Sequence, residues 1–224
     1  MPEDVFAPVI EAILRPLPWL LLFALVLFLL KLPGVRGAIG ELAVRLIVWV
    51  RLRRRAYRSV HDLILPTSDG TTQIDHVIVS GYGIFVIETK NMQGWIFGSE
   101  RQPKWTQRTR RGKYPFQNPL RQNYKHTKAI EAFLDLPAGV VHSVVVFSGE
   151  ATFKTAMPAN VTRGAGFVSY IRGFRDVVLS EAEVVQIVDQ LRACKKRQTR
   201  ASRSSHVMAL RERHHNASPS RKQQ

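Results

Sequence analysis

Two apolar segments separated by a short glycine-containing turn constrain the fold of this chain most strongly. Residues 73–79 and 84–90 are rich in valine, isoleucine and phenylalanine, and residues 80–83 between them read Ser-Gly-Tyr-Gly. β-Branched and aromatic residues favour strands, and a glycine-containing tetrapeptide between two such runs is typical of a β-hairpin. The region therefore predicts two antiparallel strands joined by a tight turn.

The expected register of this hairpin brings three charged residues together. If the turn comprises two residues, Asp75 lies directly opposite Glu88, and Lys90 shares their face because side chains alternate along a strand. Directly opposed residues have Cβ atoms about 4.5–5.5 Å apart. Two carboxylates at that separation repel each other unless a divalent cation lies between them. The pattern predicts Mg²⁺ or Mn²⁺ at Asp75 and Glu88, with Lys90 orienting the attacking water or stabilising charge on a phosphate.

A salt-bridged patch on a solvated sheet face is the alternative interpretation of the same residues. Against it, both faces of the hairpin are expected to be buried, and His76 is expected on the opposite face as a core residue. The face shared with the charges carries Val77, Val79, Ile84 and Val86, and the other face carries Ile74, Ile78, Phe85 and Ile87. Register alone leaves both interpretations open.

Several short motifs in order resemble the nuclease-related domain family, called NERD. They are Gly-Ala-Ile-Gly-Glu at 37–41, the hairpin strands at 70–80 and 83–91, Gly-Trp-Ile-Phe-Gly at 94–98, Trp-Thr-Gln at 105–107 and Phe-Gln-Asn-Pro-Leu-Arg-Gln-Asn at 116–123. The resemblance covers roughly residues 37 to 150. It implies the PD-(D/E)xK restriction-endonuclease-like fold, an α/β fold with a mixed sheet flanked by helices.

The resemblance also implies roles for individual residues. Asp75 and Glu88 match the metal-binding acids, Lys90 the catalytic lysine, and Glu41 the acid from the first helix that completes the metal site. Gln122 matches a later polar position that helps to hold water or DNA. The residue before Asp75 is isoleucine instead of proline, a departure that the superfamily tolerates. The implied activity is metal-dependent cleavage of DNA.

The charge balance favours a polyanionic partner. The chain carries 33 lysines and arginines against 17 acidic residues, a formal net charge of +16. Nucleic acid and anionic lipid both fit this excess. One stretch mixes cations with aromatic residues, which suits phosphate contacts and base stacking. The candidate nucleic-acid contacts are Lys104, Trp105, Arg108, Arg121 and Lys125.

The N-terminal region, residues 1–33, is predicted to be a membrane anchor. Residues 17–30 are uncharged and almost entirely apolar, although 14 residues are fewer than the ~20 that span a bilayer, and a buried core helix is the alternative. The downstream flank is rich in arginine, and basic flanks stay in the cytoplasm. This predicts a single-pass protein of the inner membrane with its nuclease domain, residues 34–195, in the cytoplasm. Residues 196–224 are predicted to be a disordered basic tail.

The remaining pattern predicts an alternation of helices and strands. Expected helices are 38–56, 120–134 and 181–195, the last begun by Ser180 with acidic residues in its first turn. Expected strands besides the hairpin are 61–66, 95–97, 140–148 and 166–170, and residues 98–116 are expected to be irregular.

Three classes of function fit these features. The first is a Mg²⁺- or Mn²⁺-dependent nuclease at a membrane, favoured because a pure binding module has no need of clustered acids. The second is a non-catalytic module that keeps the nuclease fold to bind nucleic acid. The third is a membrane-surface protein whose basic charge binds anionic lipid.

Overall fold

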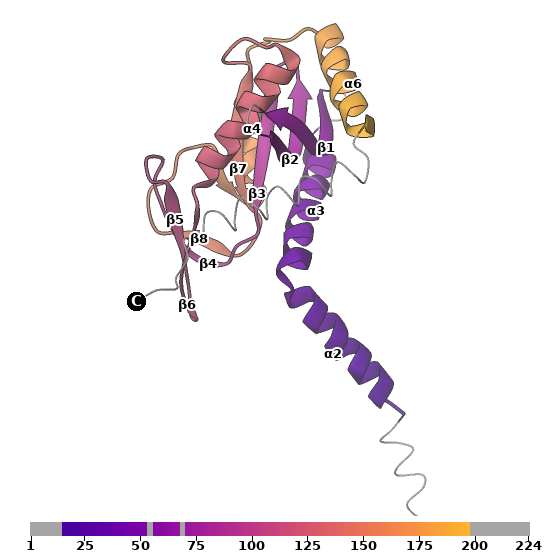
Figure 1. The fold of residues 1–224 in the computed structure, drawn as a ribbon, viewed down its shortest axis with the longest axis vertical. Coiled ribbons are helices and arrows are strands. Elements are labelled where there is room, and N and C mark those ends of the chain that lie inside the picture. Colours follow the sequence, from indigo (N-terminus) through magenta and orange to yellow (C-terminus); the bar gives the residue numbers. More distant parts are fainter. Residues whose placement is uncertain (1–14, 53–55, 68–69, 198–224) are drawn as a thin grey trace, which may run out of the picture.

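The computed structural model of the protein describes residues 15–52, 56–67 and 70–197. It has an α/β architecture with two sheets and helices on both faces of the larger one (Figure 1). The helices are α2 (Leu17–Lys31), α3 (Pro33–Arg51), α4 (Pro119–Leu134), α5 (Gly166–Arg172) and α6 (Glu181–Arg197). The strands are β1 (Tyr57–Thr67), β2 (Gly70–Ser80), β3 (Gly83–Lys90), β4 (Gly94–Phe97), β5 (Lys104–Thr109), β6 (Gly112–Gln117), β7 (Val141–Phe147), β8 (Ala151–Phe153) and β9 (Val161–Arg163).

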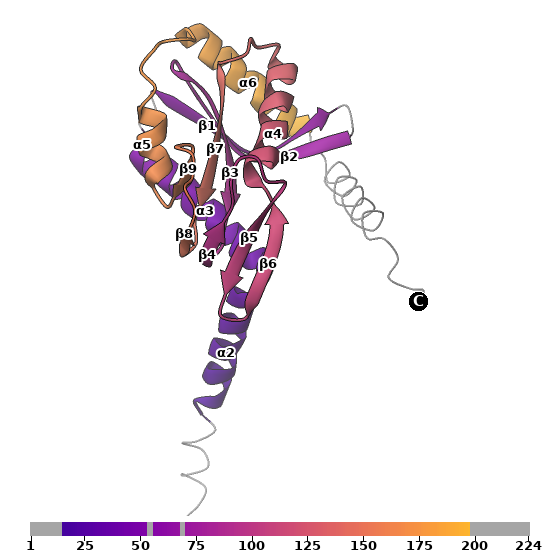
Figure 2. The ribbon, with the colours of Figure 1, turned by 90° about the vertical axis from the view of Figure 1, so that its left-hand side faces the viewer.

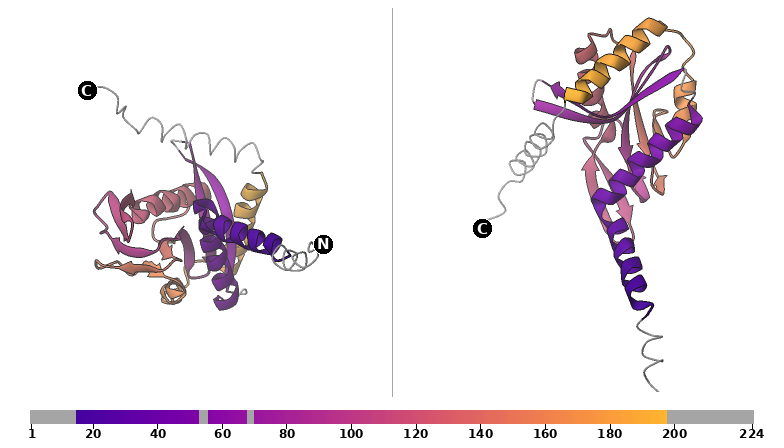
Figure 3. Two further views of the ribbon diagram at one scale, coloured as in Figure 1. Left: turned by 90° about the horizontal axis from the view of Figure 1, so that it is seen from below. Right: turned by 90° about the vertical axis from the view of Figure 1, so that its right-hand side faces the viewer.

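The larger sheet is mixed, as the sequence predicts. Its strand order is β1-β2-β3-β7-β9, antiparallel from β1 to β3 and parallel from β3 to β9. Helices α4 and α6 pack on one face, and α3 and α5 pack on the other (Figures 2 and 3). Both faces of the central strands are therefore buried, which favours long runs of valine and isoleucine in them.

The predicted hairpin register is confirmed between β2 and β3. Ser80 pairs with Gly83, and the ladder continues to His76 opposite Ile87. The Ser80 hydroxyl donates to the Gly83 carbonyl oxygen at 3.1 Å and accepts from the Tyr82 amide at 3.2 Å, which fixes the turn. Gly83 adopts a φ of 129°, where a Cβ would lie 2.9 Å from the His142 ring, so a side chain is excluded there.

The regular alternation of β1 and β2 is interrupted at one level of the sheet. Asp62 adopts a left-handed φ of 53°, and the ladder passes from the pair His61↔His76 to the pair Leu63↔Ile74 without pairing Asp62. Ile74, expected to share a face with Ile78, Phe85 and Ile87, packs instead among residues facing α4 and α6. That prediction is wrong because Ile74 and Val77 pack in the same cluster, so the side-chain alternation of β2 breaks between them, beside the left-handed Asp62 of β1.

Two segments form secondary structure that differs from the prediction. Residues 104–117 form the β5–β6 hairpin, where an irregular stretch was expected, and with β4 and β8 they build a second sheet in the order β6-β5-β4-β8. The expected strand at 166–170 is the helix α5. Phe167, Val168 and Ile171 are buried together there, at helical spacing.

Helix α3 is apolar on two sides and buries only one of them. Leu42, Leu46 and Val50 recur at helical spacing, yet they are 59–65% exposed. The core contacts come from Val44 and Val48 on another side of α3. Since α3 is apolar on two sides, the pattern alone does not decide which side packs against the sheet.

Helix α4 begins as expected and α6 is better capped than expected. The Asn118 side chain accepts from the Leu120 amide at 2.9 Å, with Pro119 in the first turn. In α6 the Ser180 amide donates to the Glu183 carboxylate at 2.7 Å, and the Glu183 amide donates back to the Ser180 hydroxyl at 3.3 Å. This is a full capping box, a stronger start signal than acidic charge alone.

The apolar N-terminal segment forms α2, which leads away from the sheets (Figure 1). In the described part of the chain, no single helix is long and apolar enough to cross a membrane. Only α2 and α3 taken together, bent by 76° at their junction, reach that length and composition. Residues 1–14 of the predicted anchor and residues 198–224 of the predicted tail lie outside the described residues.

Candidate active site

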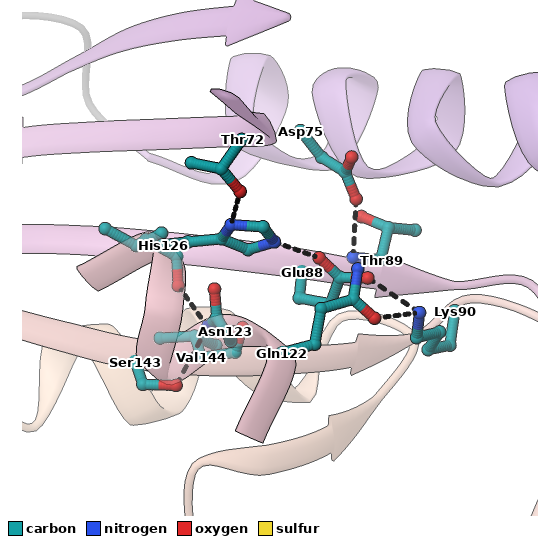
Figure 4. A network of polar contacts seen from close by, with 11 residues as sticks. Thr72, Asp75, Glu88, Thr89, Lys90, Gln122, Asn123, His126, Ser143 and Val144 are labelled. Atoms are coloured by element: carbon teal, nitrogen blue, oxygen red, sulfur yellow. Dashed lines mark hydrogen bonds and ion pairs between the residues drawn. The ribbon is translucent and has the colours of Figure 1, made fainter. Parts of the chain in front are cut away.

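Glu88 lies at the centre of a buried polar network near the end of β3 (Figure 4). Its side chain is almost fully buried, at 4% exposed. One carboxylate oxygen lies 2.7 Å from the Lys90 ammonium, and the other lies 3.2 Å from Nε2 of His126. Burial raises the pKa of Glu88, but the contacts of His126 and Lys90 outweigh it, so this pKa lies below its usual value. Glu88 is therefore held as a carboxylate.

The partners of Glu88 are themselves held in place by their neighbours. The Lys90 ammonium donates to Oε1 of Gln122 at 2.8 Å, and Nδ1 of His126 lies 2.8 Å from the Thr72 hydroxyl. Gln122 and His126 belong to α4, whereas Thr72 belongs to β2, so the network joins three elements. Networks of this kind fix side-chain positions because each member has few alternative partners.

Asp75 lies where β2 and β3 separate. The ladder ends at His76 and Ile87, so Asp75 does not pair with Glu88 through the backbone as expected. Instead its carboxylate accepts a hydrogen bond from the Thr89 amide at 2.9 Å. In a regular ladder, a backbone carbonyl of the neighbouring strand would accept this bond. Burial and the charge of Glu88 raise the pKa of Asp75 to about 7, although the Thr89 amide opposes the shift. Among the described residues, Asp75 has no ion pair with a cation.

Glu41 approaches the same region from α3, on the other side of the sheet. Burial and Asp62 raise its pKa, while the Arg45 guanidinium, 3.8 Å away, opposes the rise. Gly40 permits the approach, because a Cβ there would lie 2.5 Å from Oγ of Ser148. The charge of Glu41 also contributes to the raised pKa of Asp75, so the two carboxylates are electrostatic neighbours.

The three predicted metal ligands do not converge on one point. No group of three His, Cys, Asp or Glu side chains within the described ranges is placed to hold a metal ion. Each acid has another partner: Glu88 contacts Lys90 and His126, Asp75 accepts from a backbone amide, and Glu41 lies near Arg45. The site brings together Asp75, Glu88, Lys90 and Gln122 (Figure 4), with Glu41 as an electrostatic neighbour of the two acids.

His126 and Asn123 are site residues that the sequence analysis missed. His126 is 5% exposed, and Asn123 is fully buried, donating to the carbonyl oxygens of Val86 at 2.9 Å and Val144 at 3.1 Å. Asn123 thereby clamps β3 and β7 beneath α4. A signal was available, because Gln122 and His126 are four residues apart and so share a helix face.

Comparison with known proteins identifies the family. The family described as nuclease-related domain, NERD, matches residues 36–148. The chain belongs to the NERD family. An uncharacterized protein of Bacillus anthracis is 37% identical over 163 residues, which cover 69% of this chain and 74% of that relative. No solved structure matches the chain. The family places this chain in the PD-(D/E)xK nuclease superfamily and gives it a nuclease-related function.

The NERD domain places the predicted nucleic-acid residues in three different settings. Lys104 and Arg108 are exposed on the outer side of β5, and Arg121 and Lys125 are exposed on α4. Trp105 is 1% exposed, so the prediction that it contacts nucleic acid is wrong. Its ring stacks on Phe147 and its indole N–H donates to the Ser99 carbonyl oxygen at 2.9 Å. Alternation along β5 accounts for this, since neighbouring residues face opposite sides.

Proposed function

We propose that this NERD protein is a metal-dependent nuclease that hydrolyses phosphodiester bonds in DNA, with Mg²⁺ or Mn²⁺ as its cofactor. The observation that carries the proposal is the state of Asp75. Its carboxyl is largely buried beside a carboxylate, has a pKa raised to about 7 although the charge of Lys90 opposes the rise, and forms no ion pair with a cation within the described residues. A buried acid in this position is costly unless a cation is bound, and perturbed acids cluster at functional sites.

The donor groups around Asp75 fit a hard divalent cation. Asp75 and Glu88 would supply carboxylate oxygens, with Glu41 from the side of α3, and oxygen ligands are what Mg²⁺ and Mn²⁺ prefer. The carbonyl oxygen of Thr89 points from the same edge of β3 as the Thr89 amide, which contacts Asp75. This carbonyl oxygen would therefore be a further oxygen donor beside Asp75. A bound cation would activate a water molecule and stabilise charge on the phosphate.

The side chains of the chain itself prepare the remaining chemistry. Lys90 is held between Glu88 and Gln122, where its ammonium can orient a water molecule or neutralise a phosphate oxygen. Gln122 is positioned to hold the same water or the DNA backbone. His126, braced by Thr72, contacts the far oxygen of Glu88 and so fixes the orientation of this carboxylate.

A cleavage assay on the full chain, kept in mild detergent, tests the proposal. We expect cleavage of single- or double-stranded DNA with Mg²⁺ or Mn²⁺, none in EDTA, and a loss of about 100-fold or more for Asp75→Ala and Lys90→Ala. Asp189→Ala, on the exposed side of α6, is the matched control and should retain activity. Cleavage that needs no metal, or that survives both site substitutions, contradicts the mechanism. Undiminished DNA binding without any cleavage supports the non-catalytic module instead.

Membrane attachment through the N-terminal region is the second part of the proposal. The supporting observation is that Trp19, Leu21 and Phe23 on α2 are 62–73% exposed, an apolar surface that water-soluble proteins rarely present. We expect the full chain to remain with inner membranes after alkaline carbonate extraction, and a chain starting at residue 34 to be released. With the basic flank inside, a fluorescent protein fused after Gln224 should fluoresce and a fused periplasmic phosphatase should be inactive.

A further inference from the structure

The second sheet presents one face to solvent, and strand pairing arranges that face in rows. Lys113 on β6 pairs with Arg108 on β5, which pairs with Trp95 on β4, which pairs with Thr152 on β8. Residues directly opposite one another across a sheet point to the same side. These four side chains therefore form one continuous row across the whole sheet. The strands β4, β5, β6 and β8 that build this sheet are labelled in Figure 2.

Positive charge characterises this face, and within the described part of the chain its cations form no ion pair with a carboxylate. Lys104 and Arg108 point outward from β5, Lys113 does so from β6, and Lys154 follows β8, all of them exposed. The four strands contain no aspartate or glutamate. We call Lys104, Arg108, Lys113, Lys154 and Trp95 together the cationic sheet face. Unpaired cations gathered on one surface are typical of sites for polyanions.

Trp95 is exposed in the middle of these cations. Its side chain is 44% exposed, whereas Trp105 on the opposite side of the sheet is buried at 1%. The Arg108 guanidinium carbon lies 5.5 Å from the Trp95 ring centroid, and the Lys154 ammonium lies 4.6 Å from it. These cation–π contacts, from the strands on both sides, hold the indole in place between two groups that bind phosphate.

A hollow beside Trp95 offers space for a flat group. It has a volume of about 340 Å³ and is lined by Gly94, Trp95, Arg108, Thr109 and Arg110. Gly94 adopts a φ of 85°, where a Cβ would lie 2.6 Å from the Arg108 carbonyl oxygen. The close approach of β4 and β5 at this point therefore depends on glycine.

The cationic sheet face is joined directly to the candidate active site. Strand β4 begins four residues after Lys90, and α4, which carries Gln122, follows directly after β6. A polyanionic chain lying along the second sheet would therefore lead toward the end of β3, where Lys90 and Glu88 lie.

We propose that the cationic sheet face binds single-stranded nucleic acid, with one base stacked on Trp95 and the neighbouring phosphates on Arg108, Lys113 and Lys154. The inference rests on the proposed function in naming the substrate form of that nuclease. A base in a duplex has its faces covered by its neighbours, whereas an unpaired base can stack on an indole. When a base takes its place on the ring, the ammonium of Lys154 is free to move to a phosphate.

An anionic membrane surface is the other partner of suitable charge, and the composition of the row argues against it. Membrane-inserting surfaces place several apolar side chains among their cations. In the row containing Trp95, the other members are Arg108, Lys113 and Thr152. A single indole among cations fits base stacking better than insertion into lipid.

Binding of a fluorescein-labelled oligothymidylate to the full chain in detergent tests the inference. EDTA is present throughout, so that binding is measured without metal and without cleavage. We expect Trp95→Ala to weaken binding by roughly 5- to 150-fold and Trp95→Phe to recover most of the loss. Trp49→Ala, a comparably exposed tryptophan on α3, should leave binding unchanged. Tryptophan fluorescence should be quenched by the oligonucleotide in the wild type and in Trp49→Ala, but much less in Trp95→Ala.

Each contrary result has a definite meaning. Unchanged oligonucleotide binding by Trp95→Ala, or equal losses on a duplex competitor, overturns the stacking role. If phosphatidylserine vesicles bind through Trp95 and the oligonucleotide does not, the face is a lipid surface. Trp95-dependent binding in a protein that shows no nuclease activity removes the proposed function and leaves this inference standing. Metal-dependent cleavage with oligonucleotide binding that is independent of Trp95 supports the proposed function and overturns this inference.

Discussion

The charged residues of the larger sheet and those of the second sheet are arranged in opposite ways. Around Glu88, the charges are largely buried, and Glu88 and Lys90 have specific partners in each other, His126 and Gln122. On the cationic sheet face, the charges are exposed, and their own strands supply no acid to pair with them. The first arrangement fixes the geometry of a few atoms, as chemistry requires. The second leaves charge available for a partner whose position varies.

The two arrangements also differ in what a substitution should cost. Removing one partner of a buried charge leaves the other uncompensated, which costs about 3–5 kcal/mol of stability. Substituting an exposed charge usually changes stability by less than about 0.5 kcal/mol. If the comparison is correct, effects on stability should concentrate at the buried network and effects on binding at the second sheet.

The largest expected effect is that of His126→Ala. It removes the group 3.2 Å from Glu88 and 2.8 Å from the Thr72 hydroxyl, and leaves a cavity beneath α4. We expect a loss of about 3–5 kcal/mol in the free energy of unfolding, measured by urea denaturation. Lys128→Ala on the exposed side of α4 should leave the free energy of unfolding nearly unchanged. Equal effects of the two substitutions would mean that the Glu88 network is not a structural unit.

The next effect concerns acid stability, to which the exposed lysines and arginines do not contribute. Burial lowers the pKa of His61 to about 4 and that of His76 to about 3, and their Nδ1 atoms lie 2.9 Å apart. Both are neutral when folded but titrate near 6.5 when unfolded. Their stabilising contribution is therefore complete above pH 6.5 and is lost as the pH falls toward 4. Between pH 7.5 and 4.5 we expect a loss of roughly 2–4 kcal/mol.

A paired substitution isolates this contribution from that of the carboxylates. His61→Gln with His76→Gln removes both titrating rings while keeping polar side chains in place. The slope of stability against pH between 6.5 and 5 should become much shallower in the double variant. An unchanged slope would show that the buried histidines already take up protons in the folded state.

The sequence predicted the central hairpin because its pattern is local. The two-residue turn set the register, and alternation placed Glu88 and Lys90 on the side that α4 covers. It did not predict that the ladder between β2 and β3 ends before Asp75, or that Asp62 in the neighbouring strand is left-handed. A single residue's φ leaves no signal in the hydrophobic pattern.

Errors outside the hairpin have a different physical cause. Trp105 was assigned to nucleic acid because it lies among cations in the sequence, but cations and core residues alternate along β5. An irregular stretch, as expected at residues 98–116, has no such alternation, so the burial of Trp105 did not follow from that prediction. For α3 the difficulty was the opposite, since two of its sides are apolar and only the tertiary packing selects Val44 and Val48. In each case the long-range contacts decided what the local pattern left open.

A smaller effect is expected from Asp75→Asn in the absence of metal. The pKa of Asp75 is raised from 3.8 to about 7, so ionising this group destabilises the folded state. The contribution of Asp75 to the free energy of unfolding is therefore complete below about pH 4 and is lost as the pH rises through 7. The asparagine variant, which can still accept from the Thr89 amide, should gain roughly 1–3 kcal/mol relative to wild type between pH 4 and pH 8. Glu100→Gln, on an exposed turn, should show no such trend.

The smallest expected change in stability, and the one that most directly tests the second sheet, is that of Arg108→Gln. Because the guanidinium is exposed, we expect the free energy of unfolding to change by less than about 0.5 kcal/mol. If Arg108 contacts a phosphate, the slope of log binding constant against log salt concentration for single-stranded DNA should decrease by about 0.7. Arg192→Gln on the exposed side of α6 should leave that slope unchanged. Equal slopes for both variants would mean that the excess charge acts as a diffuse field. The cationic sheet face would then make no specific contact with the single-stranded DNA.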